Sequence, residues 1–215
     1  MSVKQAFAPL VDLVYPPRCP LCGEAIATQG GLCTQCWSTL EIPPDDRADG
    51  ITAATFYNDT ARQLVLNLKH GRKIALAPMM ARQIAARLPE MEGEWLAVPV
   101  PLHRTRLWHR GFNQSALIAR ELSRLGKGDL LVDGLIRYKR TPSRGGLGRM
   151  ERAKVLEGAI RANPARHTRM AGSKVLLVDD VLTSGATTGA CVAALRQAGV
   201  LQVQIACFSR VEHVK

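Results

Sequence analysis

The stretch Val175-Leu-Leu-Val-Asp-Asp-Val-Leu-Thr-Ser-Gly-Ala-Thr187 decides the fold of this chain. Its apolar residues predict a short buried strand over residues 174–178, and two carboxylates follow at the carboxyl end of that strand. The turn then leads into an alanine-rich helix, which we expect to begin near Thr188 and to end before Gly199. A strand, an acidic pair and a hydroxyl-rich turn in this order predict a site for a sugar phosphate.

The chemistry of this site follows from the order of its parts. The backbone N–H groups of the turn point into the open N-terminal end of the helix, where unpaired donors and the helix dipole favour a phosphate. The glycine lets the backbone come close to a ligand, and the Thr and Ser hydroxyls add donors. The two carboxylates accept hydrogen bonds from adjacent ribose hydroxyls and can help to hold Mg²⁺. The candidate residues are Asp179, Asp180, Thr183, Ser184, Gly185, Ala186 and Thr187.

A helix cap alone is the simpler interpretation of the Thr-Ser turn. Such caps are common at helix starts, but a cap gives no reason for two adjacent acids just before it. The ribose-phosphate interpretation explains both halves of the motif, and we therefore prefer it.

Two cysteine pairs near the amino terminus form the second strong pattern. Their spacing, C-x2-C-x10-C-x2-C, is typical of a tetrahedral Zn²⁺ site, and the ligands would be Cys19, Cys22, Cys33 and Cys36. Disulfides are the alternative. Pro9 and Asp12 interrupt the apolar stretch 6–15, however, so nothing resembles a secretory signal and a reducing compartment is expected. Four protein ligands would close the site, which makes the predicted zinc structural.

Length and composition favour a folded domain with a small appendage. The chain has 215 residues, of which 47% are hydrophobic, enough for a sizeable core. No apolar stretch reaches the roughly 18 residues that a membrane span needs, so we expect no membrane insertion and a cytoplasmic protein. We interpret Cys191 and Cys207, which lie on predicted core positions, as buried structural thiols.

The chain has a formal net charge of +11, and this excess is concentrated in two clusters. The first contains His103, Arg104, Arg106, His109 and Arg110; the second contains Arg137, Lys139, Arg140, Arg144, Arg149, Arg152 and Lys154. Basic runs are usually solvated faces, but two of them beside a phosphate motif favour a polyphosphate or a nucleic acid, such as single-stranded DNA, as partner. Trp108, Phe112 and Tyr138 can stack on bases, with core packing as the alternative.

The remaining sequence alternates between predicted strands and helices. Strands are expected at 51–57, 95–100, 130–138 and 203–208, and helices at 61–68, 74–88 and 115–125. This alternation predicts an α/β fold with a parallel sheet. A polar stretch at 45–50 predicts a boundary between a zinc ribbon, residues 1–48, and a main domain, residues 49–215. Ligands of such sheets bind beyond the carboxyl ends of strands, where the acidic pair and a loop after Val100 are expected.

Several motifs together give the chain a resemblance to a known family. They are Pro16-Pro-Arg-Cys-Pro-Leu-Cys-Gly23, Leu68-Lys-His-Gly71, Val98-Pro-Val-Pro-Leu-His-Arg104, Arg110-Gly-Phe-Asn-Gln114, Thr141-Pro-Ser143 and the run ending at Thr187. The run resembles the phosphoribosyl pyrophosphate (PRPP) motif of type I phosphoribosyltransferases. The whole set resembles the ComF family of competence proteins, including its GntX type. This implies a zinc ribbon joined to a phosphoribosyltransferase-like domain that binds PRPP with Mg²⁺, and a role in DNA uptake or use of external DNA alongside proteins of the uptake machinery.

The resemblance also implies roles for the basic clusters. Arg104, Arg106 and Arg110 would belong to the pyrophosphate loop, and the segment 140–154 would be a mobile loop that closes over PRPP. Arg144 stands where the family usually has glutamine, and Val155 where it usually has asparagine. These departures leave two functions open: a DNA-handling protein with a PRPP-binding domain, or an active phosphoribosyltransferase in nucleotide or base salvage. No general base is evident from the sequence.

Overall fold

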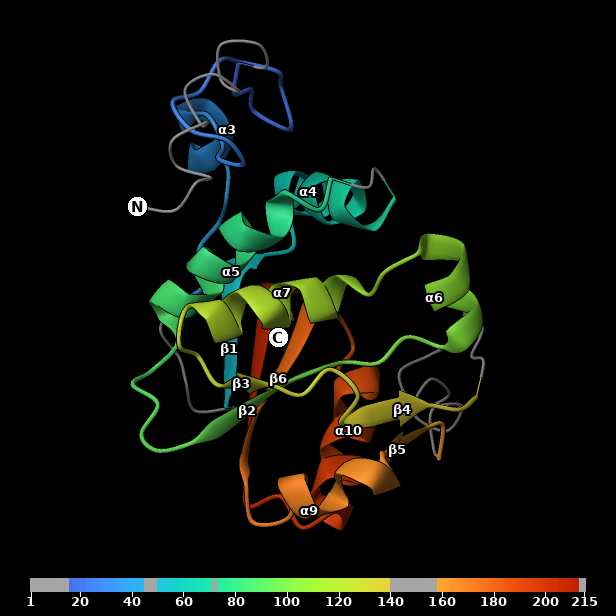
Figure 1. The fold of residues 1–215 in the computed structure, drawn as a ribbon. Coiled ribbons are helices and arrows are strands. Elements are labelled where there is room, and N and C mark those ends of the chain that lie inside the picture. Colours follow the sequence, from blue (N-terminus) through green and yellow to red (C-terminus); the bar gives the residue numbers. More distant parts are fainter. Residues whose placement is uncertain (1–15, 45–49, 71–72, 140–157, 213–215) are drawn as a thin grey trace, which may run out of the picture.

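A five-stranded parallel sheet forms the centre of the computed structural model, which describes residues 16–44, 50–70, 73–139 and 158–212. The strand order is β1-β7-β6-β2-β3 (Figure 1). The strands are β1 (Ile51–Phe56), β2 (Trp95–Pro99), β3 (Asp129–Leu130), β6 (Lys174–Leu182) and β7 (Gln202–Arg210). Because all five are parallel, their carboxyl ends meet at one edge of the sheet. The predicted α/β class with a parallel sheet is confirmed.

Helices cover both faces of the sheet (Figure 1). On one face lie α4 (Asp59–Lys69), α5 (Leu76–Arg87) and α7 (Gln114–Arg124), and on the other lies α10 (Ala186–Gln197). Successive side chains of β6 point to opposite faces of the sheet, which explains this arrangement. Leu176 and Val178 belong to the core under the first three helices, whereas Val175 and Leu177 belong to the core under α10. A strand that is buried on both faces has a continuous run of apolar residues in its sequence.

Smaller elements lie around this layered core. A short antiparallel hairpin of β4 (Leu135–Arg137) and β5 (Ile160–Ala162) packs beside α10, followed by a 3-10 turn η1 (Pro164–Arg166) and α9 (His167–Met170). The ribbon segment contains α3 (Thr34–Ser38), and α6 (Arg104–Arg110) projects from the carboxyl edge of the sheet (Figure 1). The longest described helices have 12 residues, fewer than the roughly 20 that cross a bilayer; among the described residues no helix can span a membrane.

Most predicted elements are confirmed, with shifted ends. The strands predicted at 51–57, 95–100 and 203–208 correspond to β1, β2 and β7. The helices predicted at 61–68, 74–88 and 115–125 correspond to α4, α5 and α7.

Three predictions about local structure were wrong. The strand expected at 130–138 is two strands, because a turn in which Gly134 N donates to Leu131 O separates them, and β4 pairs with β5 instead. The loop expected after Val100 contains helix α6, which is capped by His103 and ended by Gly111 at φ 82°. Strand β6 continues to Leu182, because it pairs with β7 up to that residue.

Candidate functional site

The acidic pair lies at the carboxyl end of the central strand and is buried. Asp179 and Asp180 are only 9% and 3% exposed, and both lie within β6 rather than after it. Ser115 Oγ donates a hydrogen bond of 2.9 Å to Asp179 Oδ1, which also accepts from the backbone N–H of Asp180. Two ordered donors therefore fix the orientation of the Asp179 carboxylate.

Strand β2 brings Ser115 to this carboxylate. Pro99 pairs with Val178, and Val100 N donates to Val178 O, so the chain leaves β2 directly beside the acidic pair. After α6, Asn113 returns to the same edge, where its Nδ2 donates to Val100 O at 3.0 Å and its Oδ1 caps α7. The start of α7 is thereby held against the strand that carries the acids.

Lys69 supplies a countercharge to the pair. Its Nζ lies 2.7 Å from Asp180 Oδ2, and its side chain is 23% exposed. Lys69 is the last residue of α4, so a helix far away in the sequence reaches the site. Lys69 belongs to the motif Leu68-Lys-His-Gly71 that contributes to the family resemblance, and the structure places it at the site.

The environment of Asp179 raises the pKa of its carboxyl from 3.8 to about 7. Burial is the main cause, and the negative charge of Asp180 adds to it. The hydrogen bonds from Ser115 and from the Asp180 amide, together with the charge of Lys69, oppose the shift. Asp179 can therefore change its charge near neutral pH.

This shift predicts a pH-dependent stability. Folded Asp179 holds its proton more tightly than the unfolded chain does, so the free energy of unfolding should fall as pH rises from about 4 to about 7. The variant Asp179→Asn lacks this dependence. We therefore expect the stability of wild type relative to the variant, measured by urea unfolding, to decline over this range. Asp129→Asn, at an exposed carboxylate of β3, is the control and should follow the wild type. A constant difference between wild type and Asp179→Asn would contradict the prediction.

The predicted phosphate-binding turn, residues 183–187, follows the acids and leads into α10. Gly185 adopts φ 74°, a left-handed conformation that favours glycine, and α10 begins at Ala186 rather than near Thr188 as predicted. Thr188 Oγ1 donates to Gly185 O at 2.9 Å and is buried, so this hydroxyl is used within the helix. Residues 183–187 are half-buried or exposed, which leaves the turn accessible to a ligand.

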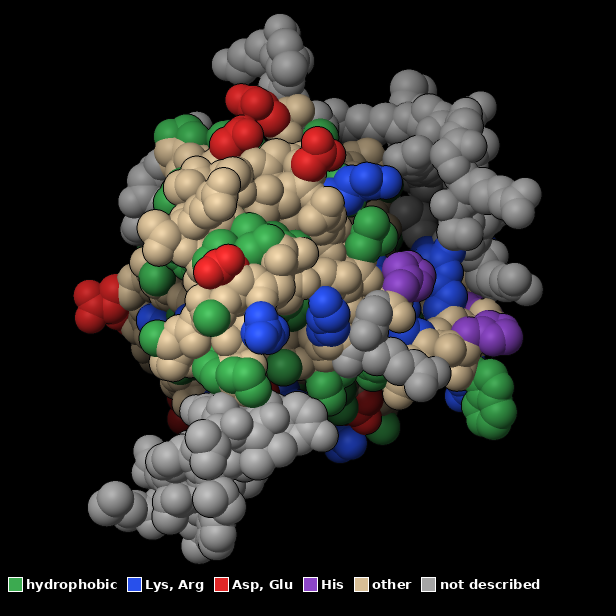
Figure 2. Space-filling model, turned by 90° about the horizontal axis from the view of Figure 1, so that it is seen from above, with side chains coloured by type: hydrophobic (Ala, Val, Ile, Leu, Met, Phe, Trp, Pro, Cys, Tyr) green, Lys and Arg blue, Asp and Glu red, His purple; other side chains and the backbone are tan. Residues whose placement is uncertain are grey.

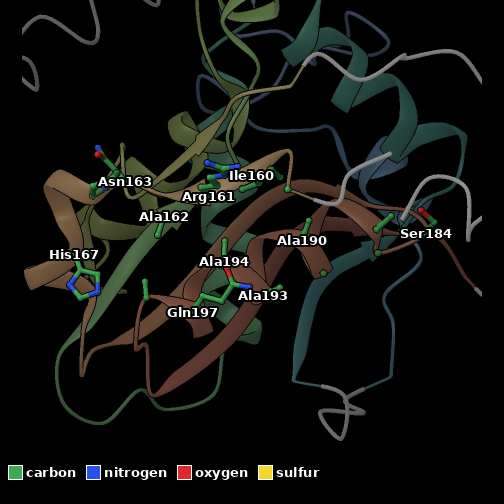
Figure 3. Close-up of a pocket in the computed structure, with 16 residues that line it drawn as sticks. Ile160, Arg161, Ala162, Asn163, His167, Ser184, Ala190, Ala193, Ala194 and Gln197 are labelled. Atoms are coloured by element: carbon green, nitrogen blue, oxygen red, sulfur yellow. The ribbon is translucent and has the colours of Figure 1, made fainter. Parts of the chain in front are cut away.

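A cavity of about 1120 Å³ begins at this turn and runs along α10. Ser184 and Gly185 line one end, and Arg161, Asn163 and His167 form the wall opposite the helix (Figure 3). The helix contributes mainly alanines and glycines to the floor. The open space is thus continuous with the turn that is suited to phosphate.

The three predicted arginines differ in how deeply they are buried. Arg110 is half-buried, and its Nη1 donates to Gln114 Oε1 at 2.6 Å. Burial lowers its pKa, whereas the nearby charge of Asp180 favours its cationic form. Arg106 is also half-buried and Arg104 is exposed on α6. Arg110 therefore interacts electrostatically with the acidic pair.

Sequence reasoning placed Arg137 only in the second basic cluster and missed its burial. This residue of β4 is 8% exposed, and burial lowers the pKa of its guanidinium, as does the charge of Arg106. Asp179 is among the charges that favour its cationic form. The signal was its alternation with Leu135, which places both side chains on the buried face of the strand. The predicted mobile loop at 140–154, including Arg144, lies outside the described residues.

The four cysteines of the ribbon converge. Their sulfur atoms all lie within 4.8 Å of one another, and Cys22 Sγ is 3.5 Å from Cys33 Sγ. A tetrahedral zinc with Zn–S bonds of about 2.3 Å separates its sulfur ligands by about 3.8 Å, so the cluster fits such an ion. Burial opposes ionisation of Cys19, but backbone donors at Cys22, Cys33 and Leu21 outweigh it and lower its pKa to about 6. Cys191 and Cys207, predicted to be buried, are fully buried in the main domain.

Comparison with known proteins identifies the same two parts. Residues 10–47 match the model of a double zinc ribbon domain, and residues 139–213 match that of a phosphoribosyl transferase domain. The DNA utilization protein YhgH of Escherichia coli (strain K12) is 27% identical over 209 residues, covering 89% of this chain and 89% of that protein. Competence protein F of Haemophilus influenzae is 26% identical over 195 residues, covering 88% and 82%. The chain is therefore similar over most of its length to these two relatives, in line with the predicted ComF resemblance, and has a cysteine-rich ribbon ahead of a phosphoribosyltransferase domain.

Proposed function

We propose that this protein acts in the uptake or use of external DNA and that its main domain, residues 49–215, binds PRPP with Mg²⁺. The names of its relatives, competence protein F and DNA utilization protein, support the biological role. The main observation for the choice of ligand is a buried acidic pair near the carboxyl end of β6 that lies a few residues ahead of a glycine turn at the start of α10. Residues 1–48 form the structural zinc ribbon in this proposal.

Each part of PRPP has a matching group at the sheet edge. The 5′-phosphate would take the N–H groups of residues 183–187, and the ribose hydroxyls would donate to Asp179 and Asp180. Guanidinium groups bind phosphate oxygens through paired hydrogen bonds, so Arg106 and Arg110 suit the pyrophosphate. Arg104 is the more exposed member of this set. When bound, Mg²⁺ would neutralise part of the pyrophosphate charge, and oxygen ligands such as these carboxylates suit it.

The alternative function is catalysis by the same site in nucleotide or base salvage. The bond from ribose C1′ to pyrophosphate would break and a bond from C1′ to a base would form, with pyrophosphate leaving. The intact acidic pair, with arginine on the adjoining element, favours this alternative. Release of pyrophosphate from PRPP in the presence of free bases would support it, whereas PRPP binding without turnover would support the binding role.

A direct test compares PRPP, nucleoside monophosphates and single-stranded DNA as ligands of the full chain. Calorimetry with Mg²⁺ should show that PRPP binds more tightly than a nucleoside monophosphate, because only PRPP presents both phosphate groups to the turn and the arginines. Equal or undetectable binding of PRPP would overturn the ligand assignment.

Helix α6 supports single-stranded DNA as a second partner. It carries Arg104, Arg106 and His109 beside Trp108, which is 87% exposed. Figure 2 shows Lys, Arg and His side chains gathered along one side of the molecule, with most of the visible acidic side chains elsewhere. An exposed aromatic ring between cations offers a stacking surface for a base and charges for its phosphates. Proteins of the DNA-uptake machinery are the other partners that this role implies.

Salt and mutation should separate the two contributions of α6. Single-stranded DNA binding should weaken with salt, with a slope of roughly 0.7 per phosphate contacted. Arg104→Ala should flatten that slope by about one contact, whereas Trp108→Ala should lower the affinity and leave the slope unchanged. Arg124→Ala, at the end of α7 away from α6 (Figure 1), is the control and should change neither. A fluorescence titration without DNA binding at low salt would exclude this partner.

A further inference from the structure

The ribbon holds helix α4 at its N-terminal end. Thr39 Oγ1 lies 2.8 Å from Thr60 Oγ1, and Asn58 Nδ2 donates to Thr39 O at 2.7 Å. Asn58 is also the N-cap of α4, because its Oδ1 accepts from Ala61 N at 3.0 Å. The residue that caps the start of α4 is thereby hydrogen-bonded to Thr39, the residue that follows α3 in the ribbon.

The ribbon also holds α4 at its C-terminal end. The carbonyl of Pro20 accepts from Asn67 Nδ2 at 3.3 Å and from Lys73 Nζ at 3.0 Å. Pro20 lies between Cys19 and Cys22, so a metal bound by both thiolates would fix the direction of this carbonyl. These two bonds join the turn of the first cysteine pair to the last turn of the helix and the residues just beyond it.

Apolar packing supports the same contact. Leu21, Leu32 and Leu40 of the ribbon pack against the core that contains Leu64 and Leu68 of α4. Both α4 leucines are fully buried. The position of α4 therefore depends on the ribbon on one side and on the sheet on the other.

Helix α4 in turn carries the countercharge of the candidate site. Its last residue, Lys69, forms the 2.7 Å ion pair with Asp180 and lies two residues beyond Asn67. Helix ends fray when their partners are lost, and Lys69 lies in that last turn. Without Lys69 the buried acidic pair would lack this positive charge, which would disfavour an anionic ligand beside it.

We propose that the zinc ribbon positions Lys69 at the ribose-phosphate site, with Asn67 and Lys73 as the positioning residues that transmit the effect. The inference rests on the proposed function for its ligand, PRPP. In this proposal, loss of the ribbon's metal loosens the end of α4 and thereby weakens PRPP binding. The ribbon itself provides no residue that contacts PRPP.

The test uses full-length protein in which both donors to Pro20 are replaced. The variant Asn67→Leu with Lys73→Met keeps all four cysteines, and Arg62→Met with Gln63→Leu, two exposed positions of the same helix, is the matched control. In the variant Asn67→Leu with Lys73→Met, the amide protons of the last turn of α4 should exchange with deuterium faster than in wild type. This variant should also bind PRPP with Mg²⁺ roughly five- to tenfold more weakly, at the lower end of typical coupling between sites. The control should match the wild type in both measurements.

Two further experiments test whether the effect depends on Lys69 and on the metal. In a Lys69→Gln background the same two changes should cause no further loss of PRPP affinity, and zinc-depleted wild type should show the same faster exchange in α4. Unchanged amide exchange of α4 in both the zinc-depleted protein and the variant Asn67→Leu with Lys73→Met would overturn the proposal. A loss of PRPP affinity that persists in the Lys69→Gln background would also overturn it. If wild type does not bind PRPP, the proposed function fails, while the exchange measurements still decide whether the ribbon positions α4.

Discussion

Replacement of Asp179 and Asp180 by asparagine should weaken PRPP binding more than any other change at the sheet edge. Asparagine has nearly the same shape as aspartate but presents one neutral acceptor instead of two charged oxygens. Each lost charge-assisted hydrogen bond should cost about 1.5 to 3 kcal/mol, so each single variant should bind roughly ten- to hundredfold more weakly. The double variant should lose more than either single variant.

A change in electrostatics partly offsets the loss of PRPP affinity in these variants. Removal of negative charge beside a bound phosphate is favourable, and Asp180→Asn also frees Lys69 from its 2.7 Å ion pair. We therefore expect Asp179→Asn, whose side chain is fixed by Ser115, to show the larger effect. Calorimetry on folded variants measures this, with Asp129→Asn as the control that should bind like wild type. A double variant that binds PRPP as well as its parent would refute the assignment of the acids.

The sequence was sufficient for the local parts of the candidate site. An apolar run with two acids and a glycine turn fixes the strand, the acceptors and the helix start within a few residues of one another, and no distant partner is needed to recognise them. The cysteine spacing likewise predicts a cluster, because two short pairs can meet with little chain between them. In each case the pattern and its physical cause lie in the same segment.

The parts of the site that the sequence did not predict depend on strand order and on contacts between residues far apart in the sequence. Ser115 and Lys69 reach the acids only because β2 lies beside β6 and α4 ends near the same edge, which alternation of strands and helices does not determine. Helix α6 was missed for a different reason: it has no buried residue, so no hydrophobic periodicity marks it. Its signals were the capping His103 and the terminal Gly111, which are weaker because both residue types also occur in loops.

Substitution of Cys22 by serine should unfold the ribbon while leaving the central sheet folded. Within the described residues 16–44 only Cys19 and Pro43 are buried, and α3 contributes no buried residue. Such a segment has too little apolar area to order itself, whereas zinc binding contributes about 10 to 16 kcal/mol in small zinc-finger peptides. Loss of one thiolate should therefore remove most of the free energy that folds the ribbon.

Metal analysis and hydrogen exchange would measure this effect together. Wild type should contain one tightly held zinc per chain, because four cysteines converge and the other two are buried in the main domain. Cys22→Ser should lose that zinc and the protection of ribbon amides, while β6 and β7 stay protected. Cys207→Ala is the reciprocal control, since it removes a thiol from the sheet core and should keep the zinc. Wild type without zinc and with Cys19 and Cys36 oxidised would show instead that disulfides hold the ribbon, and the metal would then have no part in positioning Lys69.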